Sequence, residues 1–262
     1  MGKVTYIIPI HKFDESAETL LPNALTSIKD TKKDYTVILV GPEDVLSKTE
    51  PIVEKLKMKT SVKYVKNEGK TDFASQVNAG AFACTTKYFC VVEYDDAIME
   101  YWPKVAEDYQ NDTGAKILIP LVQLVKNGEF AAFANEIAWS AAFGKEDEML
   151  LGLGHLDIDQ LNIFMDFNVT GAFINTEDFI SIGGLKPSLK VAAWYEFLLR
   201  ACQNGLDVYV VPKLGYSHTI WRDGSYMSES AKDISKEEGT WLIETARQEY
   251  FFKKDREKKF GE

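Results

Sequence analysis

The sequence has few of the features of a secreted or membrane-spanning protein. Its three cysteines, Cys84, Cys90 and Cys202, are an odd number without metal-type spacing, which argues against a disulfide framework or a cysteine-ligated metal. No apolar run approaches the roughly 18 residues that a membrane-spanning helix needs. The first fifteen residues meet charge too early for a signal peptide. We therefore expect a cytoplasmic protein with buried, reduced thiols.

Positive charge is also scarce. The chain has 30 lysines and arginines against 40 aspartates and glutamates, a formal net charge of −10. General nucleic-acid binding needs a basic surface, so a nucleic-acid partner or acceptor is not favoured. The small basic cluster from Lys253 to Lys259 leaves a local contact open, although it also fits a solvated helix end.

Linkers and repeats are absent too. No glycine- or proline-rich segment divides the 262 residues, and 45% of them are hydrophobic, enough for one large core. We predict one domain over residues 1–225 and a C-terminal helical extension over residues 226–262.

What the first half does contain is a regular alternation of short apolar runs and amphipathic segments. Such an alternation predicts right-handed crossovers and a parallel sheet covered on both faces. Asp14 or Ser16 can cap the first helix, and Pro51 should interrupt or restart the second. The predicted strands are Val4–Ile10, Tyr35–Gly41, Ser61–Val65 and Phe89–Val92, and the predicted helices are Ser16–Lys29, Glu43–Met58 and Thr71–Cys84.

The second half is less regular. Phe130–Phe143 fits either a strand or a buried helix, and Leu153–Phe164 an irregular helix. Elsewhere we predict the strands Ala115–Val125, Phe167–Asn175 and Leu206–Pro212, and the helices Thr176–Leu185, Ala192–Asn204 and Ser235–Lys258.

Three carboxylates follow the fourth predicted strand directly: Glu93, Asp95 and Asp96. Parallel sheets bind ligands beyond the carboxyl ends of their strands. Carboxylates at alternate positions there suit a hard divalent ion such as Mg²⁺ or Mn²⁺. An acidic surface loop is the alternative.

Five segments in this order resemble the family-two, inverting glycosyltransferases of the GT-A fold. They are "VTYIIPIHK", the Asn67–Gly80 segment, "EYDD", "GAFINTEDFISIGGL" and "WYEFLLRACQNGLDVYVVP". The resemblance extends from Val4 to Trp221. It implies a Rossmann-like α/β fold with a mixed, mostly parallel sheet and helices on both faces.

The resemblance also implies an activity, the metal-dependent transfer of a sugar from a nucleotide-diphosphate sugar, by default a UDP-sugar, to an acceptor hydroxyl with inversion. Asp95 and His218 would bind Mn²⁺ or Mg²⁺, with Glu93 as a further candidate ligand. For His218, a structural histidine or a diphosphate contact is equally open. At the end of the second strand Gly41-Pro42-Glu43-Asp44 replaces the usual acids, which puts the base contact in doubt. The residues expected at the nucleotide sugar are Pro9, Ile10, His11, Glu43, Asn67, Lys70, Asn78, Glu93, Tyr94 and Arg222.

The general base is the weakest part of the match. The family places an acidic pair where this chain has Ala193 and Trp194. Glu196 is the first carboxylate available, but a helical salt bridge with Arg200 is an equal alternative, and Asp157, Asp159 or Asp166 could serve instead. The missing pair leaves a second function open, a catalytically degenerate GT-A protein that binds or supports another molecule.

The acceptor cannot be read from the sequence. Lipid, polysaccharide, protein and modified nucleic-acid hydroxyls all remain open, as does a homo-oligomer. The C-terminal helix carries Trp241, Phe251 and Phe252, which suit either a packed terminal helix or a peripheral membrane contact. A nucleotidyltransferase is disfavoured because no glycine-rich loop follows the first strand.

Overall fold

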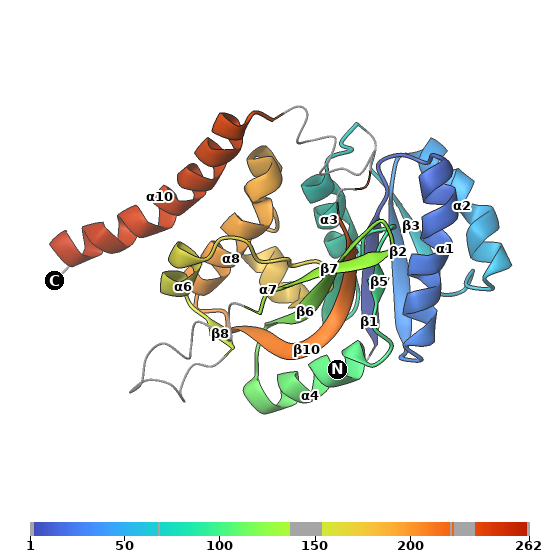
Figure 1. Cartoon of the computed structure of the whole chain (residues 1–262), viewed down its shortest axis with the longest axis horizontal. Coiled ribbons are helices and arrows are strands. Elements are labelled where there is room, and N and C mark those ends of the chain that lie inside the picture. The colour runs from blue at the N-terminus through green and yellow to red at the C-terminus, as the bar shows by residue number, and fades with distance from the viewer. Residues whose placement is uncertain (1–2, 68, 137–153, 221, 223–233, 261–262) are drawn as a thin grey trace.

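The computed structural model of the chain describes residues 3–67, 69–136, 154–220, 222 and 234–260. These residues form one mixed sheet of ten strands with helices on both faces (Figure 1). The central strand order is β3-β2-β1-β4-β9-β6-β10-β5. No helix in the described ranges is long and apolar enough to cross a bilayer.

The N-terminal half of the sheet is parallel, as predicted. β1 is flanked by β2 and β4, and β2 pairs with β3. Alternate residues of β1 enter two core clusters, one under α1 and α2 and one under α3, which explains its uninterrupted apolar sequence. The elements are β1 (Val4–Pro9), α1 (Glu15–Asp30), β2 (Tyr35–Gly41), α2 (Glu43–Lys55), β3 (Val62–Lys66), α3 (Phe73–Phe82) and β4 (Tyr88–Val91).

Two local predictions in this half have opposite outcomes. Asp14 caps α1, since its carboxylate accepts from the Ala17 amide at 3.0 Å. The predicted break at Pro51 is wrong, because α2 continues through it. Pro51 and Ser47, whose carbonyl loses its helical partner, are both exposed to water, while Val53 is buried against the sheet. The cost of the lost hydrogen bond is therefore small.

The C-terminal half of the sheet is mixed. β9 is antiparallel to both β4 and β6, whereas β6 and β10 are parallel. The segment Phe130–Phe143, which fitted either a strand or a helix, is a strand as far as Ala134, where β7 ends. Residues 137–153 lie outside the described part. The strands are β5 (Ala97–Ile98), β6 (Ile117–Lys126), β7 (Glu129–Ala134), β8 (His155–Leu156), β9 (Phe173–Asn175) and β10 (Val208–Thr219).

The predicted strand Phe167–Asn175 is mostly a turn, and only its last three residues form β9. The side chain of Asn168 accepts from the amide of Thr170 at 3.0 Å, and Gly171 has a φ of 81°. An asparagine that bonds two residues ahead favours a turn over an extended chain. The prediction was therefore too long at its N-terminal end.

The remaining helices pack chiefly on the α3 side of the sheet (Figure 1). The C-terminal helix α10 contacts α8 and η2 and buries Leu242, Ala246 and Tyr250. It is therefore packed against the rest of the chain, and the proposed boundary at residue 225 stays a prediction. The helices of this half are α4 (Trp102–Thr113), α6 (Ile158–Ile163), α7 (Thr176–Ser181), η2 (Pro187–Ala192), α8 (Ala193–Gln203) and α10 (Lys236–Phe260). Of these, α4 packs on the other face, in the core cluster that lies under α1 and α2.

Candidate functional site

The acidic segment forms a tight turn immediately after β4. The amide of Asp96 donates to the carbonyl of Glu93 at 3.1 Å, which reverses the chain toward β5. Because β1 and β4 are parallel, this turn lies at the same edge of the sheet as Pro9 and the loop after β1. The sequence predicted this location.

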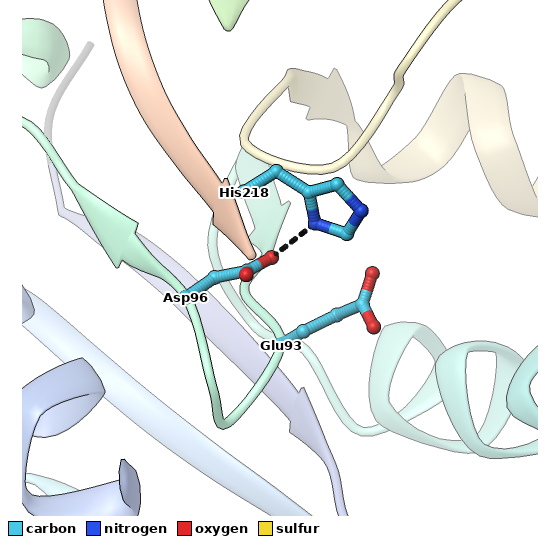
Figure 2. A group of neighbouring side chains, drawn as sticks. All are labelled: Glu93, Asp96 and His218. Carbon is cyan, nitrogen blue, oxygen red and sulfur yellow. Dashed lines mark hydrogen bonds and ion pairs between the residues drawn. The ribbon is translucent and has the colours of Figure 1, made fainter. Parts of the chain in front are cut away.

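Asp96 fastens the acidic turn to the end of β10. Its side chain is fully buried and accepts from the Tyr216 hydroxyl and the Thr219 amide, each at 2.8 Å. The Nδ1 atom of His218 lies 2.8 Å from the same carboxylate (Figure 2). The Tyr216 hydroxyl also accepts from the Glu93 amide at 2.9 Å. The end of β10 therefore fixes the conformation of the turn.

Two glycines allow Tyr216 to reach the turn. A Cβ atom on Gly171 would lie 2.6 Å from the Tyr216 ring, and one on Gly215 would lie 2.5 Å from the Trp102 ring. The Trp102 indole in turn donates to the Gly171 carbonyl at 2.8 Å. The rings of Tyr216 and Trp102 thus pack directly against the backbone of the two glycines. Any side chain at either glycine position would occupy the space that a ring now fills.

Three side chains form a candidate metal centre. One potential ligand atom from each of Glu93, Asp96 and His218 lies within 4.8 Å of the others. Figure 2 shows the Glu93 side chain extending toward the imidazole of His218. Two carboxylates and an imidazole suit Mn²⁺ and are compatible with Mg²⁺, so the donor set fits the predicted cation. Asp96 was not among the ligands predicted from the sequence.

Of the two main ligands predicted from the sequence, His218 is part of this group, whereas Asp95 points elsewhere. Its Oδ2 atom pairs with Nε of Arg222 at 2.8 Å, and both side chains are largely buried. The Arg222 guanidinium also donates to the Tyr94 hydroxyl at 2.7 Å and lies 5.2 Å from the Tyr94 ring centroid. The structure therefore gives two of the carboxylates cationic partners from the chain itself, Arg222 for Asp95 and His218 for Asp96.

Burial and mutual repulsion shift the protonation of this cluster. Burial raises the pKa of Glu93 from 4.5 to about 8, and the neighbouring Asp96 and Asp95 carboxylates add to the shift. Burial opposes a charge on His218, but the adjacent Asp96 carboxylate outweighs it and raises the histidine pKa from 6.5 to about 9. The site thus retains protons that its residues would release in water.

These shifts predict that the metal-free chain loses stability as pH rises. The charged form of His218 stabilises the fold fully below pH 6.5, and this contribution is lost as pH rises through about 9. The protonated form of Glu93 behaves likewise, with the loss running from about pH 4.5 to 8. Both signs agree, so from pH 6.5 to 9 we expect the free energy of unfolding to fall by several kcal/mol, about 2 from Glu93 and about 3 from His218.

Urea denaturation in the presence of EDTA at a series of pH values would measure this decrease. Glu93→Gln has no titrating carboxyl and should show a clearly smaller decrease, while Glu244→Gln, on the surface of α10, should match the wild type. A free energy of unfolding that stays constant over this range would contradict the assignment.

A pocket opens beside the acidic turn. Predicted residues from three separate segments meet in it: Pro9 at the end of β1 with His11 just beyond it, Glu93 to Asp95 after β4, and Arg222 after β10. The pocket is also lined by Thr71, Phe73 and Gln76. These three were missed, although they lie within the Asn67–Gly80 segment that carried the resemblance, and a glutamine among the apolar residues of α3 was a usable signal.

Other predicted site residues lie outside this lining. Ile10 is fully buried in the core. Glu43, the first residue of α2, forms an exposed ion pair with Lys66, and Asn67 donates to the Lys70 carbonyl at 2.9 Å. Their assignment to the nucleotide sugar stays a prediction.

Asn78, also predicted at the nucleotide sugar, connects α3 to the segment after α7. Its side chain donates to the carbonyl of Leu185 and accepts from the amide of the same residue, both at 2.8 Å. A Cβ on Gly184 would lie 2.6 Å from the Asn78 side chain. These contacts give Asn78 a structural part in the fold.

Glu196, the predicted base, lies in a buried ion-pair network. Its carboxylate accepts from Nε and Nη2 of Arg200 at 2.9 and 2.8 Å, from Lys186 at 2.8 Å and from the Tyr250 hydroxyl. Burial opposes its charge, but these donors outweigh it and lower the Glu196 pKa. The side chain is fully buried and does not line the pocket, which favours the alternative of a salt bridge.

The position of the missing acidic pair does lie near the pocket. Trp194 packs edge-on against Phe73, with ring centroids 6.3 Å apart. Phe73 lines the pocket, so an aromatic side chain lies next to its wall where the family has a carboxylate. Among the other candidate bases, Asp157 caps α6 by accepting from the Gln160 amide at 2.7 Å.

The chain has a mixed, mostly parallel sheet with carboxylates after its fourth strand and a pocket beside them. This arrangement is that of the GT-A fold. The profile of the family described as "Glycosyl transferase family 2" matches residues 5–170. The chain therefore belongs to glycosyl transferase family 2. A search of the curated proteins finds no significant match.

Solved structures agree with this assignment. S. aureus TarS 1-349 in complex with UDP-GlcNAc superposes with a TM-score of 0.69 at 18% identity, covering 93% of this chain and 65% of TarS 1-349. The complex of the same protein with UDP gives a TM-score of 0.63 at 17% identity, covering 83% and 60%. At this identity the likeness establishes the fold. The chain spans less than two thirds of the length of these proteins.

Proposed function

We propose that the chain transfers a sugar from a nucleotide-diphosphate sugar to an acceptor hydroxyl, with inversion and with the help of a divalent cation. The observation that carries this proposal is the pocket in which the loop after β1, the start of α3, the acidic turn and Arg222 meet. Membership of glycosyl transferase family 2 supports it, as does the likeness to TarS in complex with UDP-GlcNAc.

In this proposal the nucleotide lies along the pocket with its two ends on different segments. Pro9, His11, Phe73 and Gln76 offer rings and a buried amide, which suit a nucleoside. Arg222 also lines the pocket, and its planar guanidinium suits bidentate bonding to a diphosphate. A UDP-sugar is the donor that the likeness to TarS favours.

Glu93, Asp96 and His218 would hold Mn²⁺ or Mg²⁺, and Asp95 lies next to them on the same turn. Such a cation neutralises the charge that develops on a departing diphosphate. The end of β10 contributes by orientation, because Tyr216, His218 and Thr219 all contact Asp96 and so keep the turn in one conformation.

Inverting transfer also needs a carboxylate that removes the proton of the acceptor hydroxyl. Glu196 is enclosed by donors from Arg200, Lys186 and Tyr250, so we do not retain it as the preferred base. Trp194 beside the pocket favours the second candidate, a GT-A protein that binds a nucleotide sugar without transferring it.

Calorimetry with UDP, with and without Mn²⁺, followed by a hydrolysis assay on a panel of nucleotide sugars, tests both candidates. We expect UDP to bind with Mn²⁺ and to bind at least about tenfold more weakly in EDTA, because a cation held by Glu93, Asp96 and His218 would offset the negative charge of the diphosphate. Donor hydrolysis would support transfer, and tight binding without hydrolysis would support the second candidate. Absence of UDP binding under both conditions would contradict both.

A further inference from the structure

Arg222 forms contacts in the nucleotide-free chain that bear on how a metal ion and a nucleotide bind at the pocket. Its guanidinium is bonded to Asp95 and to the Tyr94 hydroxyl, and it lies over the Tyr94 ring. Only 15% of the Arg222 side chain and 6% of the Asp95 side chain are exposed. The positively charged guanidinium of Arg222 is therefore held, largely out of water, on the Asp95 carboxylate, which lies next to the candidate metal centre.

A divalent ion near this turn would meet Arg222 as a competitor. Two positive charges that share one set of carboxylates repel each other, and little water is present to screen them. Asp95 also cannot offer Oδ2 to an added ion while it accepts from Nε of Arg222 at 2.8 Å. In the nucleotide-free chain the ion pair thus opposes metal binding.

A bound diphosphate would reverse this balance. It brings negative charge to the pocket that Arg222 lines, and phosphate oxygens are bidentate partners for a guanidinium. Tyr94 can retain the arginine near the pocket during such a change, because its ring and its hydroxyl contact the guanidinium separately from Asp95.

We propose that Arg222 exchanges partners, pairing with Asp95 in the nucleotide-free chain and with the diphosphate in the loaded chain, so that the divalent cation and the nucleotide bind cooperatively. This inference rests on the proposed function. It adds that Arg222 lowers metal affinity in the absence of nucleotide and raises nucleotide affinity in the presence of metal. A plain diphosphate-binding residue would do only the second.

The exchange predicts effects of opposite sign on two binding constants. If the cation, held by Glu93, Asp96 and His218, also needs Asp95 free of Arg222, and the Asp95–Arg222 pair is formed in about nine of ten nucleotide-free molecules, the apparent metal affinity is reduced about tenfold. Arg222→Met should therefore bind Mn²⁺ about tenfold more tightly than wild type without nucleotide, and bind UDP at least about tenfold more weakly with saturating Mn²⁺. By linkage, UDP should also tighten Mn²⁺ binding in wild type.

Electron paramagnetic resonance of free Mn²⁺ would give the metal affinity, and calorimetry the UDP affinity. Arg247→Met is the matched control, because Arg247 also pairs with a glutamate but lies on α10 away from the pocket; it should leave both constants unchanged. Tyr94→Phe removes only the hydroxyl contact and should tighten Mn²⁺ binding less than Arg222→Met does. Thermal unfolding would confirm that each variant is folded.

Mn²⁺ binding that is equal or weaker in folded Arg222→Met would overturn the exchange, even if UDP binding is weakened as expected. In that case wild type still binds UDP with Mn²⁺, so the proposed function stands. If wild type binds neither Mn²⁺ nor UDP, the proposed function fails and the exchange fails with it.

Discussion

Asp95→Asn is expected to lose at least about a hundredfold in sugar-transfer rate while the protein remains folded. The substitution keeps the size of the side chain but removes its charge. It therefore removes the charge that Asp95 would offer to a cation at the acidic turn once Arg222 has moved to the diphosphate. The fold should tolerate the change, because the side chain of Asp96 carries the contacts with the end of β10, and Asp95 contacts Thr219 there through its backbone carbonyl, which the substitution keeps.

The rate should be measured as donor hydrolysis or transfer at saturating Mn²⁺, with thermal unfolding recorded on the same samples. Asp112→Asn, on the exposed side of α4, controls for the loss of one negative charge. A rate within a few fold of wild type for Asp95→Asn would remove Asp95 from the mechanism.

Glu196→Gln is expected to destabilise the protein by roughly 3 kcal/mol, since removing one partner of a buried ion pair leaves the other charge uncompensated. Arg200 would retain only carbonyl partners, and Lys186 and Tyr250 would lose a charged acceptor. For a chain of this size the change corresponds to a fall of roughly 6 to 12 °C in Tm. Activity at a temperature well below the lowered Tm should stay close to wild type.

Calorimetric unfolding and a low-temperature rate assay separate the two roles of Glu196. Glu244→Gln is the control, because Glu244 forms an exposed pair with Arg247 and should change stability by less than about 1 kcal/mol. If Glu196→Gln instead unfolds like wild type and has no activity, Glu196 is the base after all.

The parallel half of the fold was predictable because its signals are local. The strands β1, β2 and β4 are short apolar runs, each intervening helix has its own periodicity, and Asp14 lies at the start of the first helix. Pro51 misled the prediction, since the penalty for proline depends on whether the orphaned carbonyl reaches water. That exposure is a property of the packed structure.

The mixed half was less predictable because its strands depend on distant partners. β5 has two residues and exists through its pairing with β10, more than one hundred residues later. β10 was predicted only as far as Pro212, yet it continues to Thr219 and carries the residues that hold the acidic turn. No local periodicity marks Tyr216 as the partner of Asp96.

The candidate site likewise has features that the local sequence predicts and features that depend on distant contacts. The position of the acidic turn followed from the order of the strands, but the choice between Asp95 and Asp96 as the neighbour of His218 depends on how the turn is rotated. Likewise, Glu196 and Arg200 were recognisable as a helical pair, whereas Tyr250 joins them from 54 residues away. The sequence alone could not show that this glutamate is enclosed.

The packing of Tyr216 on Gly171 has a consequence for comparing relatives of this chain. A side chain at position 171 would displace the ring that reaches Asp96, so the two positions should vary together over a separation of 45 residues. Relatives that keep both would share the geometry of the turn even where the carboxylates themselves differ. Joint inheritance of a glycine and a tyrosine is then a marker for this subgroup that inspection of the acidic residues would overlook.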